Sequence, residues 1–366
     1  MVSFSMKLSS IALMLVVVLA VQGEEEKQNR DGKFLNLPFF PFIVVKVNPT
    51  ACTTTSNTTG TCYSSAECKS QGGTKDGSCA SGYGVCCKFE HECGAMVKSN
   101  VSYLVNDGYP SAFKGIANCQ YTIEKLNANT CQLRLDFEKF KLGQPDASSL
   151  CSVDTFTAVA GGSNTGEICG DNSGQHMYLD VSGTSVTTRI NIATSTAEDE
   201  REWRIKVTQI ACDSQMRAPV GCLQYYDSYS GNIESFNFVK DEAGLRQLGN
   251  MNYAVCIRTK DGFCGIKYSA DDLTGFSLTE ASAAGATATE KEGDTDCASD
   301  FILIPAVNQD GSVTEKDRFC GTKLSADSTV TTYAKPFIVR VLTDATETTP
   351  DAENKGFSLR FSQVPC

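Results

Sequence analysis

One short stretch of the sequence carries residue types suited to nucleophilic chemistry. Residues 167–178 read EICGDNSGQHMY, so Ser173 lies in a glycine-rich, turn-forming segment and His176 follows three residues later. A serine hydroxyl becomes a nucleophile only when a base, usually an oriented histidine, lies beside it. The sequence contains one other histidine, His91. A hydrolytic site would therefore have to use His176 or His91 as its base.

The arrangement of the cysteines argues against such a site. The 18 cysteines form three groups of six, at 52–87, 93–212 and 222–366, and the second and third groups look like a repeated unit. In the second group ICG is followed by DNSG, one residue away from the GDSG around the nucleophile of trypsin-like proteases. In the third group FCG is followed by TKLS, so no serine recurs at a fixed place. Ser173 is therefore predicted to be a turn residue, and we assign no catalytic residue.

The first 23 residues have the layout of a secretory signal peptide. Lys7 precedes the apolar run 11–21, and Gln22-Gly23 and a charged EEEK follow it. Eleven residues are too few to span a bilayer. The alternatives to a signal peptide are an uncleaved anchor and a buried strand. We expect cleavage after Gly23 and a soluble, secreted, extracellular chain whose cysteines form nine disulfides.

Charge and spacing exclude several classes of partner. The formal net charge is −11 and becomes −12 when Lys7 leaves with the signal peptide, which argues against nucleic acid and anionic membranes. A structural zinc site does not fit, because the sequence has no Cys-x2-Cys pair and only two histidines. The other apolar candidate, FLNLPFFPFIVVKV, is interrupted by polar and proline residues, so we expect no membrane insertion of the mature chain. No pattern specifies an oligomeric state.

The repeated units show the alternation that is typical of β-strands. Apolar residues at 131, 133, 135 and 137 form one face, and Gln132, Arg134 and Asp136 form the other. The pair Asp261-Gly262 separates two cysteine-bearing runs and predicts a hairpin between them. The fold class is therefore predicted to be all-β, with short strands arranged as a sandwich or jelly roll.

Residues 93–366 resemble two tandem CUB domains, which are extracellular jelly-roll β-sandwiches. The resemblance rests on CGAMVKSNVSYLVNDGYPSAFKGIANCQYTI, on the series F-x-L, C-x-x-D and CG, and on GFSLRF near the end. It implies a CUB domain at 93–212 and a less typical CUB-like domain at 222–366. The resemblance implies the disulfides Cys93–Cys119 and Cys151–Cys169, and repeat equivalence adds Cys222–Cys256 and Cys297–Cys320. The simplest completion joins the remaining cysteines as Cys131–Cys212 and Cys264–Cys366.

Residues 52–87 resemble a clip domain, whose signature is six cysteines ending in an adjacent pair. So short a segment, rich in glycine and serine, cannot bury much apolar surface and depends on its disulfides to fold. Residues 24–51 are predicted to be a linker to this small N-terminal module. The resemblance implies the pairs Cys52–Cys86, Cys62–Cys79 and Cys68–Cys87.

Calcium is the one cofactor that the CUB resemblance suggests. Many CUB domains bind it through a glutamate after F-x-L, the aspartate of C-x-x-D and a late aspartate, since oxygen ligands suit this ion. In the first unit Gly143 takes the glutamate position and Ser195 falls near the late aspartate position, so Asp154 stands alone. In the second unit Asp300 and Asp344 match, whereas Thr279 takes the glutamate position. The resemblance thus implies a partial calcium site at Asp300 and Asp344, with two turn-capping aspartates as the alternative.

The resemblance implies a secreted, non-enzymatic protein whose CUB-like domains bind an extracellular protein or a glycan, in arthropod immunity, development or matrix. The alternative is a regulatory cofactor or decoy in a clip-protease cascade, although CUB-like units here follow the clip-like module in place of a protease. N-glycosylation is predicted at Asn57 and Asn100, where NTT and NVS match the acceptor rule in a secreted chain.

Overall fold

The computed structural model describes most of the chain after residue 45. The chain divides into two units, Met1–Asn48 and Pro49–Cys366. The signal peptide and most of the predicted 24–51 linker lie outside the described residues. No helix among the described segments is long and apolar enough to cross a membrane. The described segments are 35–37, 40–42, 46–161, 163–183, 187–238, 246–271, 274–279, 289–314, 316–346 and 354–366.

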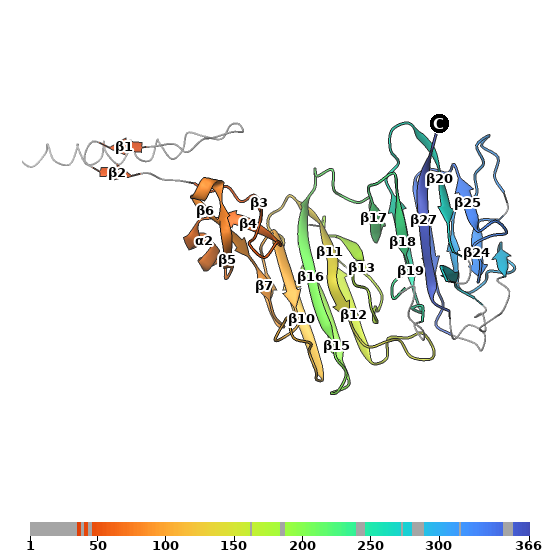
Figure 1. The fold of residues 1–366 in the computed structure, drawn as a ribbon, viewed down its shortest axis with the longest axis horizontal. Helices are drawn as coiled ribbons and strands as arrows, with labels where there is room; N and C mark the ends of the chain where they lie inside the picture. Colours follow the sequence, from red (N-terminus) through yellow and green to blue (C-terminus); the bar gives the residue numbers. More distant parts are fainter. Residues whose placement is uncertain are drawn as a thin grey trace, which may run out of the picture. The chain divides into compact units, whose positions relative to one another are not determined.

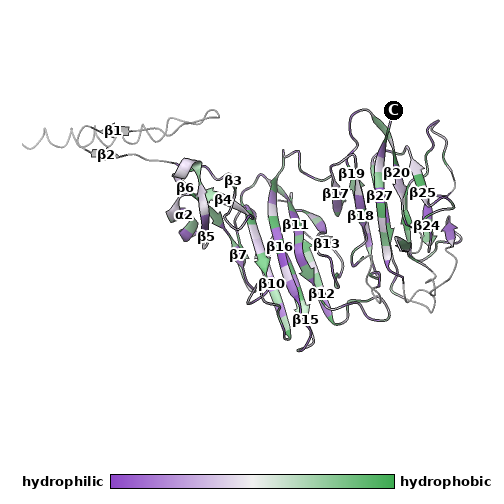
Figure 2. Cartoon of the chain, viewed as in Figure 1, coloured by the Kyte–Doolittle hydropathy of each residue, from purple (hydrophilic) through white to green (hydrophobic). Residues whose placement is uncertain are grey.

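Strands account for most of the regular structure, so the all-β prediction is confirmed (Figure 1). Within Met1–Asn48, β1 (Leu35–Leu37) pairs with β2 (Phe40–Phe42) in antiparallel orientation. Within Pro49–Cys366, a small cysteine-rich module is followed by two β-sandwiches. Figure 2 shows polar and apolar residues interspersed along the strands of both sandwiches, as the sequence pattern predicts.

Residues 49–89 form the cysteine-rich module. Its four strands lie in the order β3-β4-β6-β5, with bounds β3 (Ala51–Thr53), β4 (Thr59–Tyr63), β5 (Thr74–Cys79) and β6 (Gly84–Lys88). Helix α2 (Ser65–Ser70) begins with a capping box between Ser64 and Glu67, and a short 3-10 turn, η1 (Ala80–Gly82), precedes β6. The apolar core has four buried side chains, so three disulfides compensate for its small size: Tyr63, Cys68, Cys87 and Phe89.

The first sandwich consists of two five-stranded sheets, β13-β12-β15-β10-β8 and β14-β11-β16-β9-β7. Trp203 lies in the core between them, and its indole Nε1 donates a hydrogen bond to Tyr121 Oη at 3.0 Å. The strands are β7 (Glu90–His91), β8 (Met96–Val97), β9 (Val101–Val105), β10 (Ala117–Ile123), β11 (Thr130–Lys141), β12 (Asp154–Ala160), β13 (Ser163–Asn164), β14 (His176–Asp180), β15 (Thr188–Thr194) and β16 (Glu202–Ala211).

The second sandwich pairs the sheet β17-β19-β26-β23-β24-β22 with the sheet β18-β27-β20-β25, and β21 pairs with β27. The prediction of a hairpin around Asp261-Gly262 is wrong. Strands β19 and β20 belong to different sheets, and the chain crosses from one sheet to the other at this turn. The strands are β17 (Gln224–Tyr226), β18 (Ser230–Glu234), β19 (Asn252–Ile257), β20 (Phe263–Ser269), β21 (Phe276–Ser277), β22 (Glu290–Glu292), β23 (Phe301–Leu303), β24 (Arg318–Gly321), β25 (Thr329–Thr332), β26 (Phe337–Leu342) and β27 (Gly356–Pro365).

Nine disulfides join the 18 cysteines, and each stays within one of the three groups of six. They are the pairs that the two resemblances imply. Cys131–Cys212 joins β11 to the residue that follows β16, across 81 residues. Cys264–Cys366 joins β20 to the residue that follows β27, across 102 residues. The other pairs are Cys52–Cys86, Cys62–Cys79, Cys68–Cys87, Cys93–Cys119, Cys151–Cys169, Cys222–Cys256 and Cys297–Cys320.

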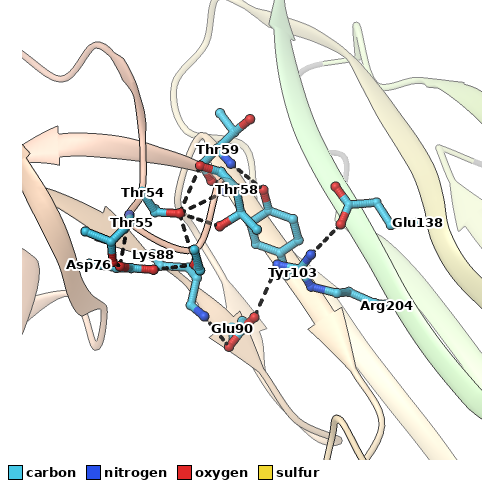
Figure 3. Close-up of polar contacts among 11 residues, drawn as sticks. Thr54, Thr55, Thr58, Thr59, Asp76, Lys88, Glu90, Tyr103, Glu138 and Arg204 are labelled. Atoms are coloured by element: carbon cyan, nitrogen blue, oxygen red, sulfur yellow. Dashed lines mark hydrogen bonds and ion pairs between the residues drawn. The ribbon is translucent and has the colours of Figure 1, made fainter.

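The chain that leaves the cysteine-rich module becomes an edge strand of the first sandwich. Strand β7 pairs with β9 in parallel, with Glu90 opposite Tyr103. The Tyr103 hydroxyl accepts a hydrogen bond from Thr59 N at 2.9 Å and donates one to Thr59 O at 3.0 Å (Figure 3). The Arg204 guanidinium lies 4.0 Å from the Tyr103 ring centroid and bonds Glu90 and Glu138. Residues 90–91 are therefore part of a sheet rather than a free spacer.

Candidate functional site

Ser173 and His176 each bond the backbone of a different strand. Ser173 lies in a turn, as predicted, and its Oγ accepts a hydrogen bond from Phe140 N at 3.0 Å. His176, on β14, places Nε2 at 3.0 Å from Tyr225 O and 3.2 Å from Tyr225 N, in the second sandwich. The two side chains therefore hold strands together, and the polar atoms that a hydrolytic pair would need are engaged in these contacts.

Burial strongly changes the acid–base behaviour of His176. Its ring is 7% exposed and contacts the rings of Tyr178 and Tyr226 edge-on. Desolvation, together with the nearby positive charge of Arg134, lowers the pKa of His176 to about 4. Asp136, which sits opposite His176 across the sheet, acts in the other direction. His176 is therefore neutral near pH 7.

Acidification is expected to weaken the fold through His176. Its pKa is about 4 in the folded protein and 6.5 without the fold, so the unfolded chain binds the extra proton between these two pH values. Stability is therefore present above this window and is lost as the pH falls through it, by about 3 kcal/mol. Denaturant unfolding of wild type and His176→Gln at several pH values measures the effect, because glutamine does not titrate. An equal pH dependence in both proteins would contradict this role.

The aspartate of the first C-x-x-D motif is neutralised by an arginine. Asp154 and Arg201 are fully buried; Arg201 Nε is 2.7 Å from Asp154 Oδ2, and Nη2 is 2.8 Å from Oδ1. The remaining guanidinium nitrogen, Nη1, donates to the carbonyls of Thr196 and Asp199 at 2.8 and 2.7 Å. The pKa of Arg201 is raised, chiefly by its hydrogen bonds to Asp154. The chain itself therefore supplies the cation that pairs with this carboxylate.

The backbone around Asp154 leaves no place for an acidic side chain at position 143. Gly143 N donates to Asp154 Oδ2 at 2.6 Å, and a Cβ added at Gly143 would lie only 2.9 Å from that oxygen. With glycine here and Arg201 bound to both carboxylate oxygens, the residues present do not fit calcium. Sequence reasoning missed Arg201; the available signal was a C-x-x-D aspartate that lacks its acidic companions and lies in a buried strand.

The two predicted calcium residues of the second sandwich lie next to each other. Asp300 is 3% exposed; its Oδ1 accepts from Asp344 N at 2.8 Å and its Oδ2 from Gln247 Nε2 at 3.1 Å. The Asp344 carboxylate accepts from Thr346 N at 2.7 Å and so caps its own turn. Thr279, at the glutamate position, donates through Oγ1 to Asp300 O at 3.0 Å. The described residues thus bring two carboxylates to this end of the sandwich.

Both predicted glycosylation sites remain predictions, and the structure suggests that they differ. Asn57 is exposed in the turn between β3 and β4, whereas Asn100 is half-buried and its carbonyl accepts a hydrogen bond from Gln209 N at 2.9 Å. We expect fuller occupancy at Asn57, because an attached glycan must project into solvent. Glycosidase treatment of Asn57→Gln and Asn100→Gln, made in animal cells, measures each mass shift. An unshifted mass for both would overturn the prediction.

Comparisons with known proteins agree with this fold. A model of the CUB domain matches residues 93–207, and a model of the animal CUB domain matches residues 219–364. The boundaries drawn at the outer cysteines, 93–212 and 222–366, stay predictions. No curated protein matches the chain.

Several solved structures resemble the chain at low identity. The CUB1-EGF-CUB2 domains of rat MASP-1 are 14% identical, with 74% of this chain and 100% of that chain covered and a TM-score of 0.27. The corresponding human MASP-1/3 structure is 13% identical, with 73% and 100% covered and a TM-score of 0.26. The MASP-1 CUB2 domain bound to Ca2+ is 20% identical, with 32% and 98% covered and a TM-score of 0.27. The two family models together span most of the chain, which therefore belongs to the CUB-domain family and carries two CUB domains in tandem.

Proposed function

We propose that the chain is a secreted, non-enzymatic protein that uses its CUB domains to bind another extracellular protein. The observation that carries this proposal is the pair of CUB domains, since such domains generally mediate extracellular protein interaction. The nine disulfides fit an oxidising compartment. The structural bonds of Ser173 and His176 support a role without catalysis. An arthropod source and a place in immunity, development or matrix belong to the same proposal.

The proposed binding surface is the end of the second CUB domain that carries Asp300 and Asp344. Two carboxylates in a chain of net charge −11 favour a basic group on the partner, such as a lysine ammonium. Among the described residues no cluster of three or more acidic, histidine or cysteine side chains could hold a metal. Calcium at this end therefore remains a proposal, and calorimetric titration with millimolar calcium tests it.

The protein partner is tested by crosslinking the secreted chain in its native fluid and identifying what is captured. Asp344→Ala is expected to lower the yield of that partner at least about fivefold if this end forms the centre of the interface. Asp310→Ala is the matched control, because Asp310 is also a turn-capping aspartate of this domain and accepts a hydrogen bond from Ser312 N at 2.9 Å. Equal capture by both variants would move the interface elsewhere, and no specific partner would remove the proposal.

The second candidate function is that of a regulatory cofactor or decoy in a clip-protease cascade. It rests on the module at 52–87, whose six cysteines end in an adjacent pair and form Cys52–Cys86, Cys62–Cys79 and Cys68–Cys87. Deleting residues 52–87 and assaying cascade activation distinguishes the two functions. Loss of the effect on the cascade favours this candidate, whereas unchanged partner capture favours the first.

A further inference from the structure

The outer face of one sheet in the second CUB domain carries an open groove. Its cavity volume is about 520 Å³, and it lies over three neighbouring strands, β18, β27 and β20. We call it the β27 groove; its polar lining consists of Ser230, Asn232, Lys267, Ser269, Arg360 and Ser362.

Strand alternation places these polar side chains together. In the register of the sheet, Ser362 lies opposite both Ser230 and Lys267, and Arg360 lies opposite both Asn232 and Ser269. The residues of β27 that alternate with them, Leu359 and Phe361, point into the core and are buried. Short serine side chains beside longer cationic ones leave a hollow on the outer face.

The charge of the β27 groove is opposite in sign to that of the chain. Among the residues that the structure describes, the groove is lined by two cationic side chains and no carboxylate, although the chain has a net charge of −11. Lys267 is exposed, and Arg360, whose side chain is 61% exposed, pairs with Asp271 at 3.0 Å. A smaller hollow of about 110 Å³ shares Arg360 with the groove and is also lined by Glu234 and Asp271, whereas Lys267 lines only the larger hollow. The larger hollow is therefore the cationic end of the face.

We propose that the β27 groove binds an anionic glycan, meaning a saccharide chain that carries sulfate or carboxylate groups. Lys267 and Arg360 can pair with the anionic groups, and the hydroxyls and the Asn232 amide can exchange hydrogen bonds with sugar hydroxyls. Aromatic or aliphatic anchors usually form the centre of a protein interface, and the described residues of the groove present none, because Phe361 is 2% exposed and its ring points into the core. This site is independent of the Asp300 and Asp344 end.

The test is binding of the full secreted chain to immobilised heparin, to a carboxylate-only saccharide such as hyaluronan, and to polyglutamate, at physiological salt. The double variant Lys267→Ala/Arg360→Ala is expected to bind the preferred saccharide about tenfold more weakly, since the loss of two exposed charge pairs corresponds to this factor. Lys98→Ala/Lys114→Ala is the matched control, because these lysines are 65% and 53% exposed on the first CUB domain.

Each result decides the proposal. Preference for heparin identifies sulfate, and binding of hyaluronan identifies carboxylate; in both cases the groove variant alone must lose affinity. An equal loss in the control variant would show general charge attraction, and equal binding of polyglutamate would show an acidic peptide site. Either outcome, or no binding of the wild type to any saccharide, overturns the glycan site. Partner capture through Asp344 would be unaffected.

Discussion

Replacing Arg201 with methionine is expected to lower the free energy of unfolding by about 3–5 kcal/mol. The change removes the guanidinium that bonds both oxygens of the fully buried Asp154 carboxylate, at 2.7 and 2.8 Å. It leaves a negative charge in the protein interior, whereas methionine roughly keeps the packing of the arginine stem. Denaturant unfolding followed by intrinsic fluorescence measures the loss, because Trp203 is the single tryptophan and lies in the same domain.

Two further variants separate the buried pair from a general effect of losing an arginine. Arg360→Met removes an exposed ion pair with Asp271 and is expected to change stability by less than about 1 kcal/mol. The double variant Asp154→Ala/Arg201→Met removes both charges and should recover part of the loss. A loss below about 1 kcal/mol in Arg201→Met, or a double variant less stable than the single one, would contradict the proposed role of Arg201.

Removal of the long-range disulfide Cys131–Cys212 is expected to destabilise the first CUB domain by about 4.5 kcal/mol. The bond closes a loop of 81 residues and joins the start of β11 to the residue that follows β16. Without it, the unfolded chain regains the entropy that this closure removes. The measurement is the denaturant midpoint and slope of the variant in which both cysteines are replaced by alanine.

The control lies in the same domain. Cys151–Cys169 closes a loop of only 18 residues, and its removal is expected to cost about 3 kcal/mol by the same entropy model. The difference between the two variants tests the dependence on loop length. If the short loop proves the more costly one, native-state contacts rather than chain entropy determine the stabilisation.

Local alternation was sufficient to predict a strand over residues 131–137, which lies within β11. Leu133, Leu135 and Phe137 are buried as the period of two requires. The same pattern misplaced Gln132, which is 2% exposed, because the backbone of Ala218 covers it with hydrogen bonds at 2.8 and 3.2 Å. Ala218 lies in the segment before the second CUB domain, 86 residues from Gln132. The alternation of neighbouring residues cannot predict a contact between such distant positions.

The candidate site shows the same division between local and long-range information. The resemblance to CUB domains identified Asp154, Asp300 and Asp344 as carboxylates at the positions where the family places ligands. What neutralises or caps each carboxylate was not predictable, because Arg201 is 47 residues from Asp154 and the two meet only when β12 and the start of β16 are folded. The failed hairpin at Asp261-Gly262 has a similar cause, since a turn motif does not specify the sheet that receives each strand.

The guanidinium of Arg201 is synthesised with the chain, in a fixed ratio of one per molecule. A bound ion stabilises a fold according to its free concentration relative to its dissociation constant, so dilution or chelation weakens that stabilisation by mass action. The stability of the Asp154 site does not depend on a free ion concentration, because the guanidinium of Arg201 is covalently part of the chain. Both of its bonds to Asp154 form as the first CUB domain folds. Its melting temperature should therefore be the same in chelator and in calcium-rich fluid.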